Sequence, residues 1–378
     1  MNTIQEKFIT LRDISYSKAL ILKMQLEMRG VNCFITNIQA GDSIVDIHLE
    51  EAFSETAFRL LEEMQRGPAT DKEVVVKQLR SVRRILVPVD FSDRSIKAAH
   101  YALELARTLK AEIKLLHVWF NSTGETFIFN EMFAFQTNLE PVMREMEHQA
   151  LQQLTDLSDS LIQRVRSERM RGVSVKIDLV RGSTVDSILD IAHEYQPGLI
   201  VMGTRGKNRD TLHIMGSTTS KLIAKSKVPV MVIPEGYDIN HFYAPHHLAY
   251  ITHFDDDDFF ALHRLMTFIR PFKPKVYCLH IQSDIDPVFD RLRMRQLRNY
   301  FQSSYATVDI ECGLIETADP VEGLEAFVKE MKIDVIAIMM RRRNLLEKLL
   351  EPSLTKQLLF QSTTPLLVFR ETNEATGK

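Results

Sequence analysis

Three glycines and a run of hydroxyl residues carry the clearest chemical signal in the sequence. The run reads Gly203-Thr204-Arg205-Gly206, then nine residues, then Gly216-Ser217-Thr218. A strand is predicted over 199–202 and a helix over 217–226, so the run joins a strand to a helix. Glycines let the backbone approach an anion closely, and free N–H groups at a helix N-terminus attract negative charge. The spacing therefore predicts a phosphate-binding loop.

Two better-known loops do not fit this run, and a plainer interpretation exists. No Gly-Lys-Ser or Gly-Lys-Thr follows the last glycine, as a P-loop requires, and the spacing is not G-x-G-x-x-G. In the plainer interpretation, the glycines serve a tight turn and Ser217 only caps the following helix.

Further segments belong with this loop. They read Ile85-Leu86-Val87-Pro88-Val89-Asp90-Phe91-Ser92, Leu116-His117-Val118 and Val180-Arg181-Gly182. Together with the G-x2-G-x9-G-S pattern, they resemble the universal stress protein family. The resemblance covers nearly all of 82–234 and, more weakly, 245–370.

This resemblance implies a site for ATP, with or without Mg, and a role for each matching residue. The residues implied to hold the nucleotide are Pro88, Val89 and Val118 around the adenine, Asp90 at the adenosine moiety, and Gly203, Arg205, Gly206, Gly216, Ser217 and Thr218 at the ribose and phosphates. Without the resemblance, Asp90 could simply cap the turn that follows its strand. One departure is Gly198, where the family often has an aspartate.

Apolar strands alternate with amphipathic helices from residue 84 onward, which predicts a parallel sheet with helices on both faces. Residues 83–118 align with 246–281 without a gap, and 228–233 resembles 364–369. The expected fold class is α/β. It comprises two tandem doubly wound, Rossmann-like domains, of the adenine nucleotide alpha hydrolase-like type by resemblance, after a small α+β module.

The expected domains are 1–75, 82–235 and 243–371. The first has the pattern βαββα and resembles small modules assigned to signal transduction, although an interaction or oligomerisation module fits equally well. Residues 119–166 lengthen the first repeat, either as a helix that covers the sheet or as a lid over a ligand.

The second repeat lacks the glycine loop. Met339, Arg342 and Pro352 stand where the first repeat has Gly203, Gly206 and Gly216, and His253 stands where it has Asp90. Bulky side chains would keep phosphate from the backbone, and proline has no N–H to offer. We therefore expect a structural second repeat that pairs 364–369 with 228–233 in an intrachain pseudo-dimer.

Composition excludes several classes. The formal net charge of −3 gives no general basic field for nucleic acid. No apolar run is long enough to span a membrane, and the N-terminal residues do not resemble a signal peptide. Three scattered cysteines lack zinc-site spacing and favour a reducing compartment. The expectation is a cytoplasmic protein.

Three functions remain open. The first is a stress-response regulator whose ATP occupancy changes its shape or its protein partners, which the sequence does not identify. The second is a weak ATPase, although no base beside a nucleophile is evident. The third is a scaffold without a nucleotide. Association into a homo-oligomer is left open.

Overall fold

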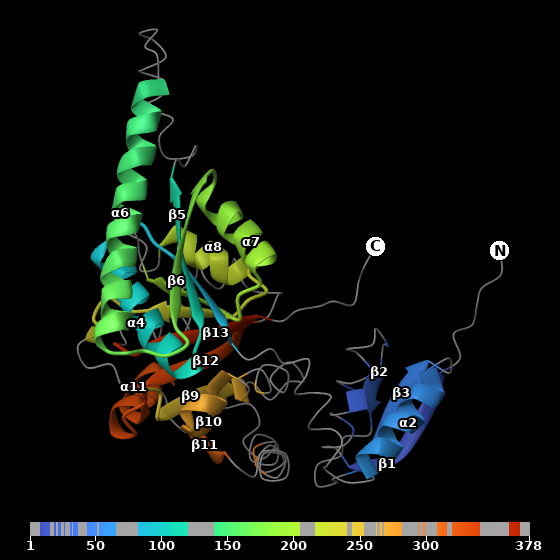
Figure 1. Ribbon diagram of the computed structural model, residues 1–378. Coiled ribbons are helices and arrows are strands. Elements are labelled where there is room, and N and C mark those ends of the chain that lie inside the picture. The colour runs from blue at the N-terminus through green and yellow to red at the C-terminus, as the bar shows by residue number, and fades with distance from the viewer. Residues whose placement is uncertain are drawn as a thin grey trace, which may run out of the picture.

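The computed structural model describes 8–15, 19, 22–23, 26, 31, 33–36, 44–50, 53–65, 82–119, 140–204, 216–239, 244–252, 262, 265–266, 268–281, 294, 298, 308–315, 320–340 and 363–370. These residues form a ten-stranded sheet with helices on both faces, and a separate three-stranded sheet near the N-terminus. Figure 1 shows the arrangement.

The large sheet has the order β11-β10-β9-β12-β13-β8-β7-β4-β5-β6. Its strands are β4 (Arg84–Pro88), β5 (Glu112–Trp119), β6 (Ser174–Arg181), β7 (Leu199–Gly203), β8 (Val230–Ile233), β9 (His247–Thr252), β10 (Lys275–Ile281), β11 (Asp309–Ile315), β12 (Val335–Met340) and β13 (Leu366–Arg370). Each half places its strands in the same order, with the first strand at the centre. All neighbours within a half run parallel, which confirms the predicted tandem α/β fold.

Helices cover both faces of this sheet. In the first repeat, α4 (Asp93–Leu109) and α6 (Glu140–Ser167) pack on one face, and α7 (Thr184–Tyr195) and α8 (Ser217–Lys225) on the other. In the second repeat, η3 (Arg270–Phe272) and the helical residues before it share the face of α4, whereas α11 (Pro320–Glu330) shares that of α7. Because both faces are buried, the central strands are apolar along their length.

The halves meet where β8 and β13 pair antiparallel. Val232 lies opposite Leu366, Met231 opposite Leu367, and Val230 opposite Val368. These strands lie in the two segments, 228–233 and 364–369, for which the sequence analysis expected pairing. Alternate side chains point to opposite faces, so each face carries a core that continues from one repeat into the other.

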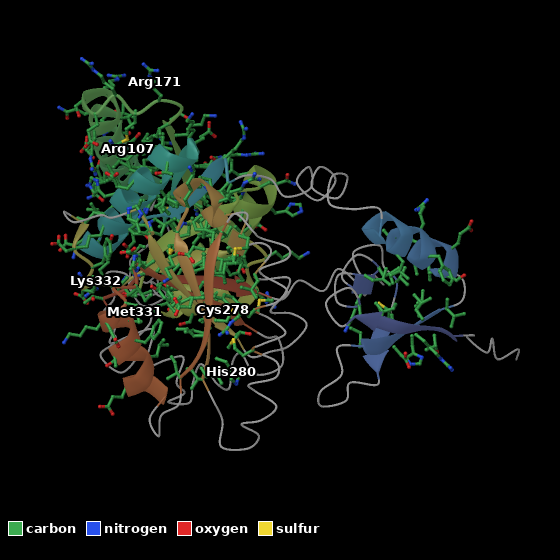
Figure 2. The ribbon with its side chains drawn as sticks, turned by 90° about the horizontal axis from the view of Figure 1, so that it is seen from below. Arg107, Arg171, Cys278, His280, Met331 and Lys332 are labelled. Carbon is green, nitrogen blue, oxygen red and sulfur yellow. The ribbon has the colours of Figure 1, made fainter. Side chains whose placement is uncertain are left out.

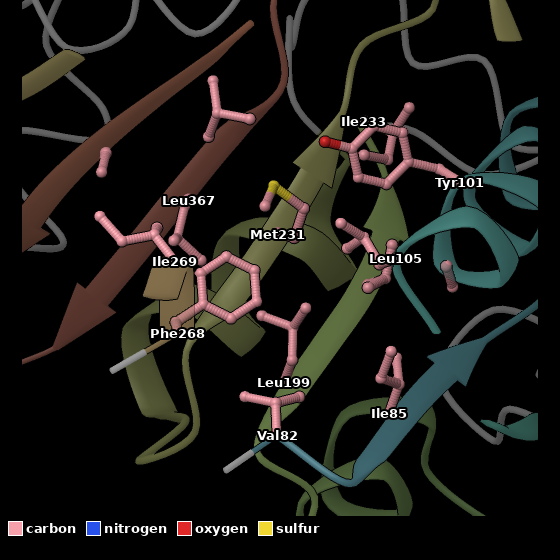
Figure 3. Packing of buried hydrophobic residues seen from close by; sticks show 14 of the residues in the cluster. Val82, Ile85, Tyr101, Leu105, Leu199, Met231, Ile233, Phe268, Ile269 and Leu367 are labelled. Atoms are coloured by element: carbon pink, nitrogen blue, oxygen red, sulfur yellow. The ribbon is translucent and has the colours of Figure 1, made fainter. Parts of the chain in front are cut away.

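Figure 3 shows this junction on the α4 face. Met231 and Leu367 lie between Tyr101 of α4 and Phe268 and Ile269 of the second repeat. Met231 and Leu367 are completely buried. The packing therefore joins helices of both repeats over the antiparallel pair.

The two repeats follow the same chain path despite their limited identity. Left-handed backbone recurs at aligned positions, at Lys110 and Lys273 and again at Gln196 and Lys332. Strand-entry hydrogen bonds recur as well. The Glu112 amide donates to the Arg83 carbonyl (2.8 Å), and the Lys275 amide donates to the His246 carbonyl (2.7 Å).

The N-terminal sheet has the order β1-β3-β2, with antiparallel neighbours. Its strands are β1 (Phe8–Ser15), β2 (Cys33–Thr36) and β3 (Ile44–Glu50), followed by α2 (Ser54–Gln65). Helical residues between β1 and β2 include Ala19, Leu22 and Leu26, all buried in this unit's own core. The predicted βαββα pattern is therefore present.

Two local features shape the ends of these elements. The register of β1 with β3 shifts between Leu11 and Ile14, and the pairing continues to Ser15. Helix α4 begins at Asp93, and the side chain of its N-cap, Ser92, accepts from the Ser95 amide.

The long insertion of the first repeat contains helix α6. It contacts the sheet core through Leu154, Leu157 and Leu161. Residues 120–139 of the segment expected to form a covering helix or a lid lie outside the described residues. Among the described helices, none has the length and apolar character needed to cross a bilayer.

Because the cores of the two repeats are continuous, we expect a destabilising substitution in one repeat to lower the stability of the other as well. We expect Leu367→Ala to lower the free energy of unfolding by about 2–5 kcal/mol, because it removes a fully buried side chain. The single tryptophan, Trp119 of β5, lies in the first repeat. Urea unfolding followed by Trp119 fluorescence should therefore shift to a lower midpoint.

The matched control is Leu151→Ala on α6, where the side chain is 42% exposed. It should change the free energy of unfolding by less than about 0.5 kcal/mol. An unchanged Trp119 transition in Leu367→Ala, with loss of structure elsewhere, would mean that the repeats unfold independently.

Candidate functional site

Those predicted site residues that the structure describes lie at the carboxyl edge of the first half-sheet. Strands β4 and β7 are neighbours. The chain leaves β4 for α4 on one face and leaves β7 towards α8 on the other. Ligands of open α/β sheets bind where adjacent strands diverge in this way. Asp90 follows β4, and Gly203 ends β7.

A tight hydrogen-bonded turn holds Asp90. Its Oδ1 accepts from the Ser92 amide (3.1 Å) and from the Ser92 hydroxyl (2.6 Å). The Asp90 amide donates to Ser95 Oγ (3.3 Å), and Phe91 between them has φ 60°. The turn-capping role is therefore present. A carboxylate has further lone pairs, so this role leaves acceptor capacity for a ligand.

The predicted adenine-pocket residues lie on the two neighbouring strands β4 and β5. Pro88 ends β4, and the Val89 amide extends the ladder by donating to the Leu116 carbonyl (2.8 Å). Val89 is buried, whereas Pro88 and Val118 are half-buried. Val118 packs against the core on the α7 face. The three residues thus line adjacent strand ends.

His117 is fixed beside this pocket. Its Nδ1 lies 2.7 Å from the Val89 carbonyl oxygen, so Nδ1 is the donor, and its ring centroid lies 4.4 Å from that of Phe91. His280 makes the same contact with the Thr252 carbonyl (2.9 Å) in the second repeat. Recurrence in a repeat without the loop supports a packing role for this histidine.

Gly203 lies so close to helix α4 that a side chain at this position would collide with the helix. A Cβ at this position would lie 3.1 Å from the carbonyl carbon, the oxygen and the Cβ of Arg94. The end of β7 therefore lies directly against the first turn of α4. From the sequence, this glycine was expected either at the ribose and phosphates or in a tight turn. Its contact with α4 was not expected, because helix packing leaves no local sequence signal.

Backbone bonds close the base of the glycine loop. The Thr204 amide donates to the Ile233 carbonyl (3.2 Å), and the Gly216 amide donates to the Thr204 carbonyl (2.8 Å). Thr219 Oγ1 donates to the Gly203 carbonyl (3.0 Å). Two predicted ligand residues, Arg205 and Gly206, lie outside the described residues.

The start of α8 differs from the prediction in one respect. Gly216, not Ser217, is the N-cap, and no side chain caps the helix. Gly216 has φ −58°, so its role does not depend on left-handed backbone. Ser217 is exposed and Thr218 half-buried in the first turn. The Gly216 cap has no side chain of its own to accept from the first N–H groups of α8, which are groups of the kind that bind anions.

Two cations beside the site were missed by sequence reasoning. Arg94 Nη2 donates to Glu235 Oε1 (2.6 Å), and Lys97 Nζ donates to the Glu235 carbonyl (2.8 Å). Glu235 follows β8 and begins the connection to the second repeat. The sequence did offer one signal for this pair of cations. Arg94 lies in the first turn of α4, where the helix dipole disfavours a positive charge.

The second repeat differs at the matching positions. Met339, near the end of β12, is buried where the first repeat has Gly203. His253, Arg342 and Pro352 lie outside the described residues. Within the described part of the chain, no cluster of three His, Cys, Asp or Glu could hold a metal ion.

The departure at Gly198 lies at the amino ends of the strands, opposite the site. A Cβ there would lie 3.0 Å from Val82 Cα. Its counterpart Asp334 accepts from the His246 and His247 amides (2.8 and 2.9 Å). The aspartate thus orders a strand entry in the second repeat, whereas close packing excludes a side chain in the first.

Comparison with known proteins gives one consistent match. The model of the "Universal stress protein family" matches 81–234 and 257–370. Stress response protein NhaX of Bacillus subtilis is 28% identical over 170 residues, covering 40% of this chain and 96% of that protein. Universal stress protein MJ0577 of Methanocaldococcus jannaschii is 29% identical over 153 residues, covering 40% and 94%.

One solved structure spans both repeats. The crystal structure of a universal stress protein from Archaeoglobus fulgidus covers 77% of this chain and 97% of its own, with a TM-score of 0.59 and 18% identity. At this identity, the likeness concerns the fold.

The contact between Gly203 and α4 gives a direct test of the site's construction. We expect Gly203→Ala to lower the free energy of unfolding by about 1–3 kcal/mol, because its Cβ meets backbone that cannot rotate away. Thermal and urea unfolding would measure the change.

The control is Gly313→Ala in β11, where a Cβ would lie 3.6 Å from Leu279 Cδ2, an ordinary contact. It should be tolerated better than Gly203→Ala. Equal tolerance at both positions would contradict the close approach of β7 to α4.

Proposed function

Because this chain belongs to the universal stress protein family, with two tandem family domains, we propose that it is an ATP-binding regulatory protein of the stress response. The nucleotide binds at the carboxyl edge of the first repeat. The carrying observation is the open N-terminus of α8, capped by Gly216 without a side chain, next to the Asp90 turn across the switch point. The phosphates of ATP would bind the N–H groups at the start of α8, and its adenosine would lie against the ends of β4 and β5.

Each implied ligand has a suitable place. Pro88, Val89 and Val118 offer apolar surface to adenine, and Asp90 offers an oriented acceptor to the adenosine hydroxyls. Gly203, Gly216, Ser217 and Thr218 surround the base of the loop, and Arg205 and Gly206 complete it in sequence. Mg accompanies the phosphates in this proposal as a counter-ion, without a dedicated protein cluster.

The second repeat acts as a structural partner in this proposal. Its β13 covers the edge of β8, and an uncovered apolar edge strand would invite aggregation. Met339 fills the position of Gly203 with a buried side chain. We therefore propose one nucleotide per chain and an intrachain pseudo-dimer. The proposed boundaries are 82–235 and 243–371, after an N-terminal module over 1–75.

Two alternatives make different demands on the site. A weak ATPase needs a group that activates water, and His117, the histidine beside the pocket, donates through Nδ1 to the Val89 carbonyl, so only its Nε2 could serve as that base. A scaffold needs no open helix N-terminus. We also propose a cytoplasmic location, which is consistent with three cysteines that are all free.

Calorimetric titration of the full chain with Mg-ATP tests the proposal. We expect one site per chain, and we expect Gly216→Val to abolish binding. A β-branched side chain at the N-cap would stand between the anion and the first amides of α8. Circular dichroism of the variant should show that the fold is retained.

Pro352→Gly is the matched control, since it changes the aligned position of the second repeat, and it should leave the stoichiometry at one. Two sites would disprove the structural role of the second repeat. Absence of binding by folded wild-type protein would favour the scaffold. Turnover of order 1 per second or more would favour an enzyme.

A further inference from the structure

Two cysteines of the second repeat lie directly opposite each other on neighbouring strands. Cys278 of β10 pairs with Cys312 of β11 in the parallel register. Neither forms a disulfide, and both are buried, Cys278 completely and Cys312 with 4% exposed. Figure 2 labels Cys278 on β10, with His280 farther along the same strand.

The first repeat shows that the fold does not need these thiols. The aligned position of Cys278 is Leu115 of β5, which lies opposite Ile177 of β6. An aliphatic pair therefore fills the same place in the same sheet geometry. The second repeat instead places two thiols in register at this position.

The backbone geometry permits a covalent bond between the two residues. Neighbouring strands lie about 4.8 Å apart, and the Cα atoms of disulfide-bonded cysteines lie about 4.4–6.8 Å apart. Both side chains belong to the same core, on the α4 face of the sheet, so their Cβ atoms point the same way. The spacing of neighbouring strands is therefore compatible with a disulfide between the two residues.

Arg298 makes the two thiols chemically unequal. Its Nη2 donates to the Cys312 carbonyl (2.7 Å). The hydrogen bond from Cys278 and then the Arg298 guanidinium lower the pKa of the Cys312 thiol, against the opposing effects of burial and of Glu311. A thiolate is the reactive form of cysteine. Cys312 lies on β11, the last strand in the order of the described sheet, and the 4% of it that is exposed is the route by which a small peroxide would reach it.

We propose that Cys278 and Cys312 form a reversible redox site in which a hydroperoxide oxidises the two thiols to a disulfide. The Cys312 thiolate attacks one peroxide oxygen, the O–O bond breaks, and the leaving oxygen takes a proton to become water or an alcohol. The Cys278 sulfur then attacks the Cys312 sulfenic acid. The S–S bond forms, the S–O bond breaks, and water leaves. Two thiols lose two electrons, and one peroxide gains them.

This site is independent of the nucleotide. The second repeat, which has lost the glycine loop, would thus carry a sensor of different chemistry in the sheet that it shares with the first. Cys33 of the N-terminal unit is an internal reference, because its thiol donates to the Lys23 carbonyl at 3.8 Å and has a different environment.

The test treats the native full chain with hydrogen peroxide, blocks remaining thiols under denaturing conditions, and identifies peptides by mass spectrometry. We expect a peptide pair joined through Cys278 and Cys312, lighter by two hydrogens and separated again by dithiothreitol. Cys33 should remain available for blocking. Oxidation of all three thiols at equal rates, or a disulfide formed only in unfolded protein, would overturn the proposal.

Variants separate the roles of the two sulfurs. Cys278→Leu and Cys312→Ile use the residue types found in the first repeat, so both should fold. Cys278→Leu should accumulate a sulfenic acid that dimedone traps, whereas Cys312→Ile should give neither disulfide nor adduct. Dimedone labelling of Cys278 in Cys312→Ile, at the rate seen for Cys312, would reverse the assignment.

Arg298→Gln tests the cation. At a pH well below the pKa of a thiol, a rise of one unit in that pKa lowers the fraction present as thiolate about tenfold. We therefore expect oxidation to slow several-fold at neutral pH, with the pH profile moved to higher pH. An unchanged profile would remove Arg298 from the site.

Discussion

The antiparallel contact between β8 and β13 is where two parallel half-sheets become one sheet. Each half alone would end in an apolar strand with unpaired amide and carbonyl groups, and pairing removes both edges at once. Because side chains alternate across the pair, the same contact connects the cores on both faces. The positions of the helices that cover this sheet, and so of the candidate site at its carboxyl edge, depend on this shared sheet.

Sharing a sheet has not kept the repeats alike. Left-handed residues, strand-entry bonds and the histidine–carbonyl contact recur at aligned positions. These features fix the chain path. Positions that do not fix the path have diverged: a glycine against α4 in one repeat is a buried methionine in the other, and an aliphatic pair has become two thiols. The fold therefore constrains the backbone turns more tightly than the side chains at strand ends.

The first turn of α4 links the site to the rest of the first repeat. Its cap belongs to the Asp90 turn, its backbone limits residue 203 to glycine, and its arginine and lysine hold Glu235 at the exit from β8. A small movement of this turn would therefore displace the ends of β4 and β7 and the connection to the second repeat. That connection also packs on α4 through the edge-to-face contact of Tyr237 with Tyr101 (5.3 Å).

The sequence by itself determined the alternation of strands and helices, the tandem repeat and the glycine loop between β7 and α8. These are local signals, carried by periodicity and spacing over a few residues. Tertiary structure alone decided that Gly216 rather than Ser217 caps α8, that Gly203 faces Arg94, and that Cys278 meets Cys312. Such contacts join residues far apart in the chain, and strand register and helix docking, set by the whole core, bring them together.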